Sequence, residues 1–168
     1  MNRRNMLNIS AVTVLGLAFL AGRADAANEK VDQKQLVGDW ALVSAGAPNP
    51  DIKPFGPNDG FATFQPNGRF SLQLILSDLP KFASNNRAKG TPDENKAVVQ
   101  GSISYFGTYS VNETDGTVTL HIERCSFPNW NGTDLKRIIT SLTGEELKYT
   151  NPAASVGGAA ELAWKRVK

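Results

Sequence analysis

Three tight turns, each between two short apolar runs, constrain the fold of this chain more than any other feature of its sequence. They lie at Pro66–Gly68, Asn112–Gly116 and Thr143–Gly144, and Pro, Asn and Gly are residues that let a chain reverse within a few positions. A tight reversal leaves the runs on its two sides antiparallel and adjacent in a sheet. The sequence therefore predicts a sheet built mainly from hairpins.

Eight runs have the length and composition of strands. They are residues 38–45, 60–65, 69–76, 102–111, 116–124, 133–141, 145–150 and 160–167. In the third run apolar residues alternate with polar ones, so that one face of the strand is apolar. Because no long crossover helix separates the runs, and because closure removes exposed sheet edges, we predict an all-β domain. Its expected architecture is an antiparallel up-and-down barrel of about eight strands.

One segment, residues 77–101, interrupts the meander between the third and fourth strands. It contains Thr91, Pro92 and Glu94, the pattern of a capping box with proline at the first helical position. We predict a short helix from Pro92 to about Gln100. Since it has few apolar side chains, the helix is expected to lie against a barrel end or wall, where the insertion can act as a lid over a cavity.

The first 26 residues have the pattern of a cleavable signal peptide. Arg3 and Arg4 precede an apolar stretch from Met6 to Gly22, and small residues around Ala26 fit a cleavage site. The paired arginines fit either a twin-arginine leader or the charged start of an ordinary signal peptide. We expect a periplasmic or secreted protein with no membrane span after cleavage. The expected organisation is a signal peptide at 1–26, a short linker at 27–35 and the barrel domain at 36–168.

The charge balance of the mature domain argues against two classes of partner. Three basic residues and one acidic residue lie in the leader, so the 18 basic and 16 acidic residues of the whole chain become 15 of each. A neutral domain is not expected to bind nucleic acid or an anionic membrane surface. Cys125 is the single cysteine, which excludes an internal disulfide, so the fold must rest on its apolar core.

His121 is the only histidine, so we set aside a catalytic triad and a multi-histidine metal site. We accordingly predict no metal and no cofactor. Glu123 lies two positions on, on the same face of its strand, and a carboxylate beside an imidazole favours proton transfer near neutral pH. His121 and Glu123 are therefore the candidates for catalytic residues. The alternative is that both lie on an exposed outer face of the barrel.

Aromatic and basic residues indicate a ligand site inside the barrel. Tyr105 and Tyr109 share one face of their strand, and Gly107 between them leaves a gap that would suit a flat ligand. Packing of the two tyrosines in the core explains the same pattern. Trp130 lies in a turn-rich loop and either plugs the mouth of the barrel or contacts a ligand. The arginines that could pair with the carboxylate of an amphipathic ligand are Arg69, Arg87, Arg124 and Arg137. The predicted ligand-binding residues are Phe70, Tyr105, Tyr109, His121, Arg124, Trp130 and Arg137.

Seven motifs match one known family in order along residues 36–168. They are Leu36–Trp40, Pro54–Pro57, Pro66–Ser71, Pro80–Ser84, Gly90–Pro92, Tyr105–Tyr109 and Phe127–Gly132. With these motifs the chain resembles the bacterial lipocalin-like domain proteins, a family of calycin-type β-barrels. The resemblance implies a lipocalin-like barrel whose floor is closed by Gly38 and Trp40 of the first strand and Arg166 of the last, with the arginine packed over the tryptophan.

Three functions are compatible with the sequence. The first is a binding protein that holds a small apolar or amphipathic molecule inside the barrel. The second is an enzyme of the cyclase or isomerase type, with His121 or a tyrosine as its proton-transfer group. The third is a structural or interaction barrel with a filled core. A cavity of a few hundred cubic ångströms separates the first from the third, and the direction of the His121 side chain separates the first from the second.

Overall fold

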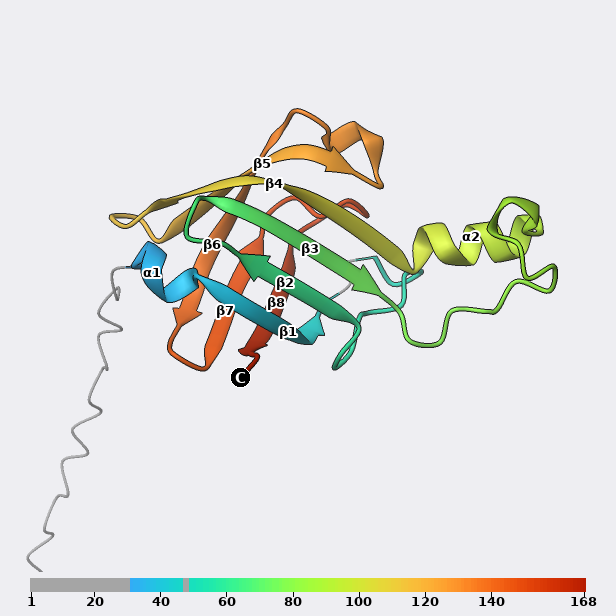
Figure 1. Ribbon diagram of the computed structural model, residues 1–168, viewed down its shortest axis with the longest axis horizontal. Helices are drawn as coiled ribbons and strands as arrows, with labels where there is room; N and C mark the ends of the chain where they lie inside the picture. The colour runs from blue at the N-terminus through green and yellow to red at the C-terminus, as the bar shows by residue number, and fades with distance from the viewer. Residues whose placement is uncertain (1–30, 47–48) are drawn as a thin grey trace, which may run out of the picture.

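Each predicted hairpin forms, and the strands close into an antiparallel barrel in chain order, with β1 paired to β8 (Figure 1). The computed structural model describes residues 31–46 and 49–168. Its strands are β1 (Gly38–Ala45), β2 (Gly60–Phe64), β3 (Arg69–Ile75), β4 (Ser102–Asn112), β5 (Thr117–Cys125), β6 (Asp134–Leu142), β7 (Glu146–Asn151) and β8 (Ala160–Arg166). The predicted eight-stranded up-and-down barrel is confirmed. The predicted signal peptide lies outside the described residues.

Inward-facing side chains pack one half of the barrel tightly. The apolar residues that strand alternation predicts on one face of β3 are buried, and the same holds for β5. The most deeply buried large side chains of the barrel include Trp40, Leu42, Leu72, Leu120, Ile122, Leu147 and Trp164. Burial of this apolar surface, at roughly 25 cal/mol per Å², is the main force that holds the strands together.

The segment that precedes β1 closes the end of the barrel where β1 begins. Asp32 caps the one-turn helix α1 (Gln33–Leu36) by accepting a hydrogen bond from a backbone amide of that turn at 2.8 Å. Leu36 is buried, and its carbonyl oxygen accepts a hydrogen bond from the indole Nε1 of Trp40 at 2.9 Å. Val31 is buried as well. Val31, in the segment expected to be a linker, and Leu36, the first residue of the expected barrel domain, thus both contribute apolar side chains to the closed end.

Arg166 completes this closed end. Its guanidinium carbon lies 4.2 Å from the ring centroid of Trp40, a geometry that stabilises by roughly 0.5–2 kcal/mol. Gly38 has a φ of +132°, and a Cβ at this position would collide with Nη1 of Arg166. Gly38, Trp40 and Arg166 therefore meet at one point, and the glycine makes room for the guanidinium.

Gly107 marks a register shift between β4 and β5. A Cβ here would collide with the backbone carbonyl oxygen of His121, so only glycine lets the two strands approach this closely. The glycine between Tyr105 and Tyr109 is therefore explained by strand pairing, and not by a flat ligand beneath the two hydroxyls.

Residues 76–101 form an arm that extends from the open end of the barrel (Figure 1). The arm contains the short helix η1 (Arg87–Lys89) and the helix α2 (Pro92–Gln100). The predicted capping box is present, since the Thr91 hydroxyl accepts from the Glu94 amide at 3.3 Å and the Glu94 carboxylate accepts from the Thr91 amide at 2.8 Å. No residue of α2 is buried. The helix therefore projects from the barrel instead of lying against its wall.

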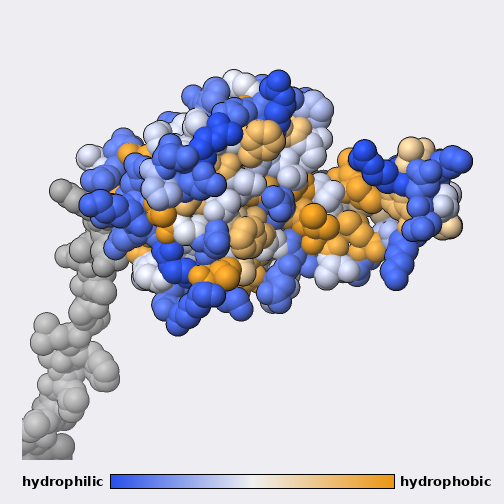
Figure 2. All heavy atoms as spheres, in the orientation of Figure 1, coloured by the Kyte–Doolittle hydropathy of each residue, from blue (hydrophilic) through white to orange (hydrophobic). Residues whose placement is uncertain are grey.

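The surface shown in Figure 2 is polar over most of the barrel, whereas apolar side chains gather where the arm leaves the open end. Ile75 at the end of β3 and Val99 of α2 are among the exposed apolar residues of this region. Among the described residues, no helix has the length and hydropathy needed to cross a membrane.

Candidate functional site

A cavity of about 430 Å³ opens at the end of the barrel opposite α1. Its walls come from the open ends of the strands, from loop residues 52–55 and 154–156, and from the last turn of α2. The volume lies within the range of roughly 300–1,000 Å³ that is typical of small-molecule sites. The open half of the barrel is therefore not filled by its own side chains.

Small residues on β1 and β8 create this space. In the closed half, Trp40 of β1 and Trp164 of β8 are fully buried in the core. Farther along the same two strands, Ala45 and Ala160 line the cavity. The inward positions of β1 and β8 thus carry tryptophan in the closed half and alanine in the open half. The smaller side chains leave volume that no side chain occupies.

Arg137 of β6 lines the cavity although only 3% of it is exposed. Its Nη1 donates hydrogen bonds to the carbonyl oxygen of Lys136 at 2.8 Å and to Oδ1 of Asn151 at 3.0 Å. Its Nη2 donates to the hydroxyl of Tyr105 at 3.3 Å. The guanidinium also lies over the ring of Tyr149, 5.9 Å from the centroid. Every one of these neighbouring groups is uncharged.

The electrostatics of this cluster leave its positive charge uncompensated. Burial raises the pKa of the Tyr149 hydroxyl above its ordinary value, so this phenol is neutral at physiological pH. The guanidinium stays protonated, since arginine in proteins keeps a pKa above about 12. Within the described part of the chain no carboxylate forms an ion pair with Arg137, and its Nε has no hydrogen-bond partner.

Three aromatic rings form one wall of the mouth. The one-turn helix η2 (Pro128–Trp130) follows β5 and places Trp130 against the cavity. The ring of Trp130 meets the rings of Tyr105 and Phe127 edge to face, with centroids 5.7 and 5.8 Å away. Such pairs stabilise by roughly 0.5–1.5 kcal/mol beyond the burial of their area. Trp130 therefore lines the cavity without filling it.

Of the predicted ligand-binding residues, those that line the cavity are Tyr105, Trp130 and Arg137. Phe70 and Tyr109 also point inward, but they are buried in the core toward the closed end. The Tyr109 hydroxyl donates to a backbone carbonyl of the β2–β3 turn at 2.9 Å, and the Phe70 ring packs against Tyr105 at 6.0 Å. These two residues are core residues beneath the cavity, and the structure does not place them in its lining.

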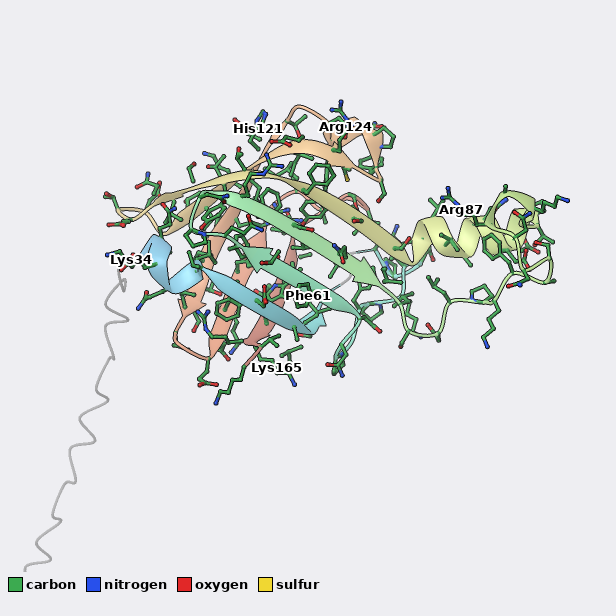
Figure 3. The ribbon with its side chains drawn as sticks, viewed as in Figure 1. Lys34, Phe61, Arg87, His121, Arg124 and Lys165 are labelled. Atoms are coloured by element: carbon green, nitrogen blue, oxygen red, sulfur yellow. The ribbon has the colours of Figure 1, made fainter. Side chains whose placement is uncertain are left out.

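His121 lies on the outer face of β5 (Figure 3). Its Nδ1 is 2.7 Å from Oδ1 of Asp134, and 53% of its side chain is exposed. In contrast to the prediction, His121 does not line the ligand site. The reason is strand alternation, because the positions that bury Leu120 and Ile122 turn the residue between them outward.

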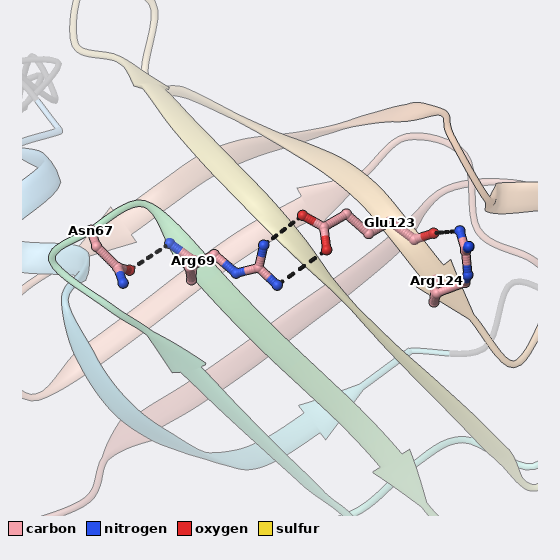
Figure 4. Close-up of polar contacts among 4 residues, drawn as sticks. All are labelled: Asn67, Arg69, Glu123 and Arg124. Atoms are coloured by element: carbon pink, nitrogen blue, oxygen red, sulfur yellow. Dashed lines mark hydrogen bonds and ion pairs between the residues drawn. The ribbon is translucent and has the colours of Figure 1, made fainter.

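Glu123 and Arg124 also lie outside the cavity, and their polar contacts are shown in Figure 4. The Glu123 carboxylate accepts two hydrogen bonds from the guanidinium of Arg69, at 2.6 and 3.1 Å. Arg124 donates from Nη1 to the carbonyl oxygen of Glu123 at 2.7 Å and points away from the barrel (Figure 3). Arg87 belongs to η1 in the arm. Of the four arginines predicted as partners of a carboxylate, only Arg137 lines the cavity.

Tyr149 and Asn151 of β7 are site residues that the sequence reasoning missed. They follow Leu147 at alternate positions, and all three are buried. Polar residues at the inward positions of a predicted strand are the signal that could have identified them. The loop residues Ile52 and Phe55 also line the cavity, but they lie in a turn-rich segment whose sequence has no periodicity.

No three His, Cys, Asp or Glu side chains come together as metal ligands among residues 31–46 and 49–168. Cys125 is partly buried, and burial raises the pKa of its thiol. A raised pKa keeps the thiol protonated and poorly nucleophilic. The lining of the cavity is mainly apolar, and its polar groups include the Arg137 cluster, the hydroxyls of Ser102 and Ser126 and the ammonium of Lys53.

Comparisons with known proteins give one family match and distant structural similarities. A family model described as a lipocalin-like domain matches residues 37–167. Among solved structures, a redesigned β-barrel has a TM-score of 0.49 and 17% identity, over 81% of this chain and 95% of that one. A deswapped triple mutant of bovine odorant-binding protein has a TM-score of 0.36 and 19% identity, over 80% of this chain and 74% of that one. No curated protein matches the chain.

Proposed function

The chain belongs to the lipocalin-like domain family, and from this premise we propose that its barrel binds a small apolar or amphipathic molecule in the cavity at its open end. The observation that carries the proposal is the cavity of about 430 Å³ in a barrel whose other half is packed. Protein interiors are close-packed, and an empty volume lowers stability. A barrel that served only as a scaffold would gain stability by filling this space.

The positions of the candidate proton-transfer groups favour binding over catalysis. His121 and Glu123 lie on the outer face, where Asp134 and Arg69 are their partners. Within the described residues, no histidine, aspartate or glutamate lines the cavity. The cyclase or isomerase alternative therefore has neither a histidine nor a carboxylate base at the site. It would rest on Tyr105 or Tyr149, which line the cavity in contact with Arg137, and we propose binding instead.

A fluorescence titration with N-phenyl-1-naphthylamine, a neutral apolar dye that brightens in apolar surroundings, tests the proposal. We expect saturable binding of one dye molecule per chain. The variant Ala160→Trp places an indole in the cavity wall and should weaken dye binding about tenfold or more, because the ligand volume is lost.

The matched control is Ala163→Trp, which places the same indole on the outer face of β8. This variant should bind the dye like the unaltered protein. The proposal fails if the dye does not bind, or if Ala160→Trp and Ala163→Trp bind it equally well.

We also propose that the protein acts in the periplasm or outside the cell. The support is the leader pattern of residues 1–26, with its basic start and its small residues before Ala27. Mass spectrometry of the protein from the periplasmic fraction of its host should find a chain that starts at Ala27. A cytoplasmic chain that keeps residues 1–26 would contradict the proposal. Replacing Arg3 and Arg4 by lysine should block export only if the twin-arginine route is used.

A further inference from the structure

We propose that the ligand carries a carboxylate, and that Arg137 binds this group at the floor of the cavity while the apolar part of the ligand extends toward the mouth. The inference rests on the proposed function, because it assumes that the cavity takes a ligand. It adds the chemical class of that ligand and its direction of entry.

The first argument is the unbalanced charge. Arg137 is almost completely buried, yet within the described residues it has no acidic partner. A buried charge without a counter-ion is strongly unfavourable, and proteins normally pair such groups. An anionic ligand would supply the missing charge. The same environment would disfavour a cationic ligand.

The second argument is the number of hydrogen bonds that Arg137 leaves unmade. A guanidinium has five N–H donors, and Arg137 uses three of them, two on Nη1 and one on Nη2. The donor on Nε is buried and has no partner in the described structure. The guanidinium therefore keeps hydrogen-bonding capacity that its neighbours do not use, and a carboxylate is the partner that arginine favours.

The third argument is the position of Arg137 along the barrel axis. Arg137 and Tyr149 border the open cavity on one side. On the other side they border a small apolar void with Leu36 and Phe64, next to the closed end. The guanidinium therefore lies at the boundary between the open cavity and the packed core. A head group bound there leaves the rest of the ligand in the apolar upper part of the cavity.

The fourth argument is that the other charged group at the cavity already has a partner. Lys53 near the mouth forms an ion pair with Asp78. None of the described lining residues is acidic, so nothing in the lining would repel a carboxylate. The structure thus directs an anionic head group to Arg137 and not to the mouth.

The test uses two probes of equal chain length, dodecanoate and dodecan-1-ol, as competitors of N-phenyl-1-naphthylamine at pH 7.5. The unaltered protein should bind dodecanoate about tenfold or more tightly than dodecan-1-ol, the size expected for hydrogen bonds to a charged group. Arg137→Met should abolish this preference while it still binds the dye. Arg137→Lys should keep part of the preference for dodecanoate, because lysine keeps the positive charge but lacks the planar guanidinium that pairs with a carboxylate through two hydrogen bonds.

The control is Arg69→Met on the outer face, which should leave the preference unchanged. Equal affinity of the unaltered protein for dodecanoate and dodecan-1-ol would overturn the inference. This comparison needs no variant, so the test still stands if a variant fails to fold. Tighter binding of dodecyl phosphate than of dodecanoate would contradict the inference that the ligand carries a carboxylate. Absence of dye binding would overturn the proposed function itself, whereas dye binding without an acid preference would overturn only the present inference.

Discussion

The two ends of the barrel use an arginine and aromatic rings in opposite ways. At the closed end, Arg166 donates to the carbonyl oxygens of Gly144 at 2.6 Å, Val37 at 2.7 Å and Gln35 at 2.5 Å, and its guanidinium lies over Trp40. At the floor of the open half, Arg137 has a free Nε and no counter-ion in the described structure. One arginine is satisfied by the fold alone, and the other requires a further partner.

This difference shows how one small barrel can separate stability from binding. The closed half contains the bulky, fully buried core residues and the Arg166 contacts, which stabilise the fold through apolar burial and hydrogen bonding. The open half contains the cavity, the small residues Ala45 and Ala160, and the uncompensated charge. Unsatisfied groups and empty volume destabilise a fold, and here they are confined to the half where a ligand can enter.

The largest expected effect comes from truncating one tryptophan at each end. Trp40→Ala should lower the free energy of unfolding by about 3–5 kcal/mol, because Trp40 is fully buried and its loss leaves a large cavity. Trp130→Ala should lower it by only about 1 kcal/mol, since Trp130 is partly buried, but it should weaken dye binding several-fold. Urea denaturation and dye titration measure the two effects. Equal losses of stability in both variants would remove the distinction between the two ends.

The next effect comes from replacing each arginine by methionine. Arg166→Met should lower the free energy of unfolding by about 2–3 kcal/mol, because it removes the cation–π contact and three hydrogen bonds from a charged donor. Arg137→Met should leave stability unchanged or raise it, since an apolar side chain avoids the burial of an unpaired charge. Thermal and urea denaturation without ligand provide the comparison. A strong loss of stability in Arg137→Met would mean that this residue serves the fold.

A smaller effect is expected at Gly38. Gly38→Ala should destabilise by about 1–2 kcal/mol, because φ is +132° and the new methyl group would displace the guanidinium of Arg166. Gly144→Ala is the matched control at the same end, since nothing lies within 4 Å of a Cβ there. Neither variant should change dye affinity. A change in dye affinity with Gly38→Ala would show that the closed end influences the cavity.

The fold and the site differ in how far the sequence predicts them. The strands follow from local signals, such as the turn at Pro66–Gly68, where Gly68 has a φ of +80°, and the alternation in β3. The capping box of α2 is equally local, and it is present as predicted. The same alternation in β5 predicts that His121 points outward, and the structure places it there, outside the predicted ligand site.

The site depends on contacts between residues far apart in the chain, and this limits its prediction. Arg137 was one of four candidate arginines, and its burial results from Tyr105 on β4 and from Tyr149 and Asn151 on β7. No local pattern shows which of several inward positions will meet across a barrel. The cavity is equally non-local, because it arises from the small size of residues on neighbouring strands.

The smallest expected effect is an acid dependence that belongs to the open end. Buried Asp59 accepts hydrogen bonds from the amides of Gly56 at 2.8 Å and Ser77 at 2.9 Å, and these bonds hold its pKa below the ordinary value. Because the folded pKa is depressed, its stabilisation is complete above the unfolded pKa of about 3.9 and is lost as the pH falls through the folded value. We expect a loss of about 1 kcal/mol in urea denaturation below pH 4. Asp59→Asn should reduce this loss, whereas Asp39→Asn on the outer face of the closed end should not. An equal reduction in both variants would show that the acid sensitivity does not belong to the open end.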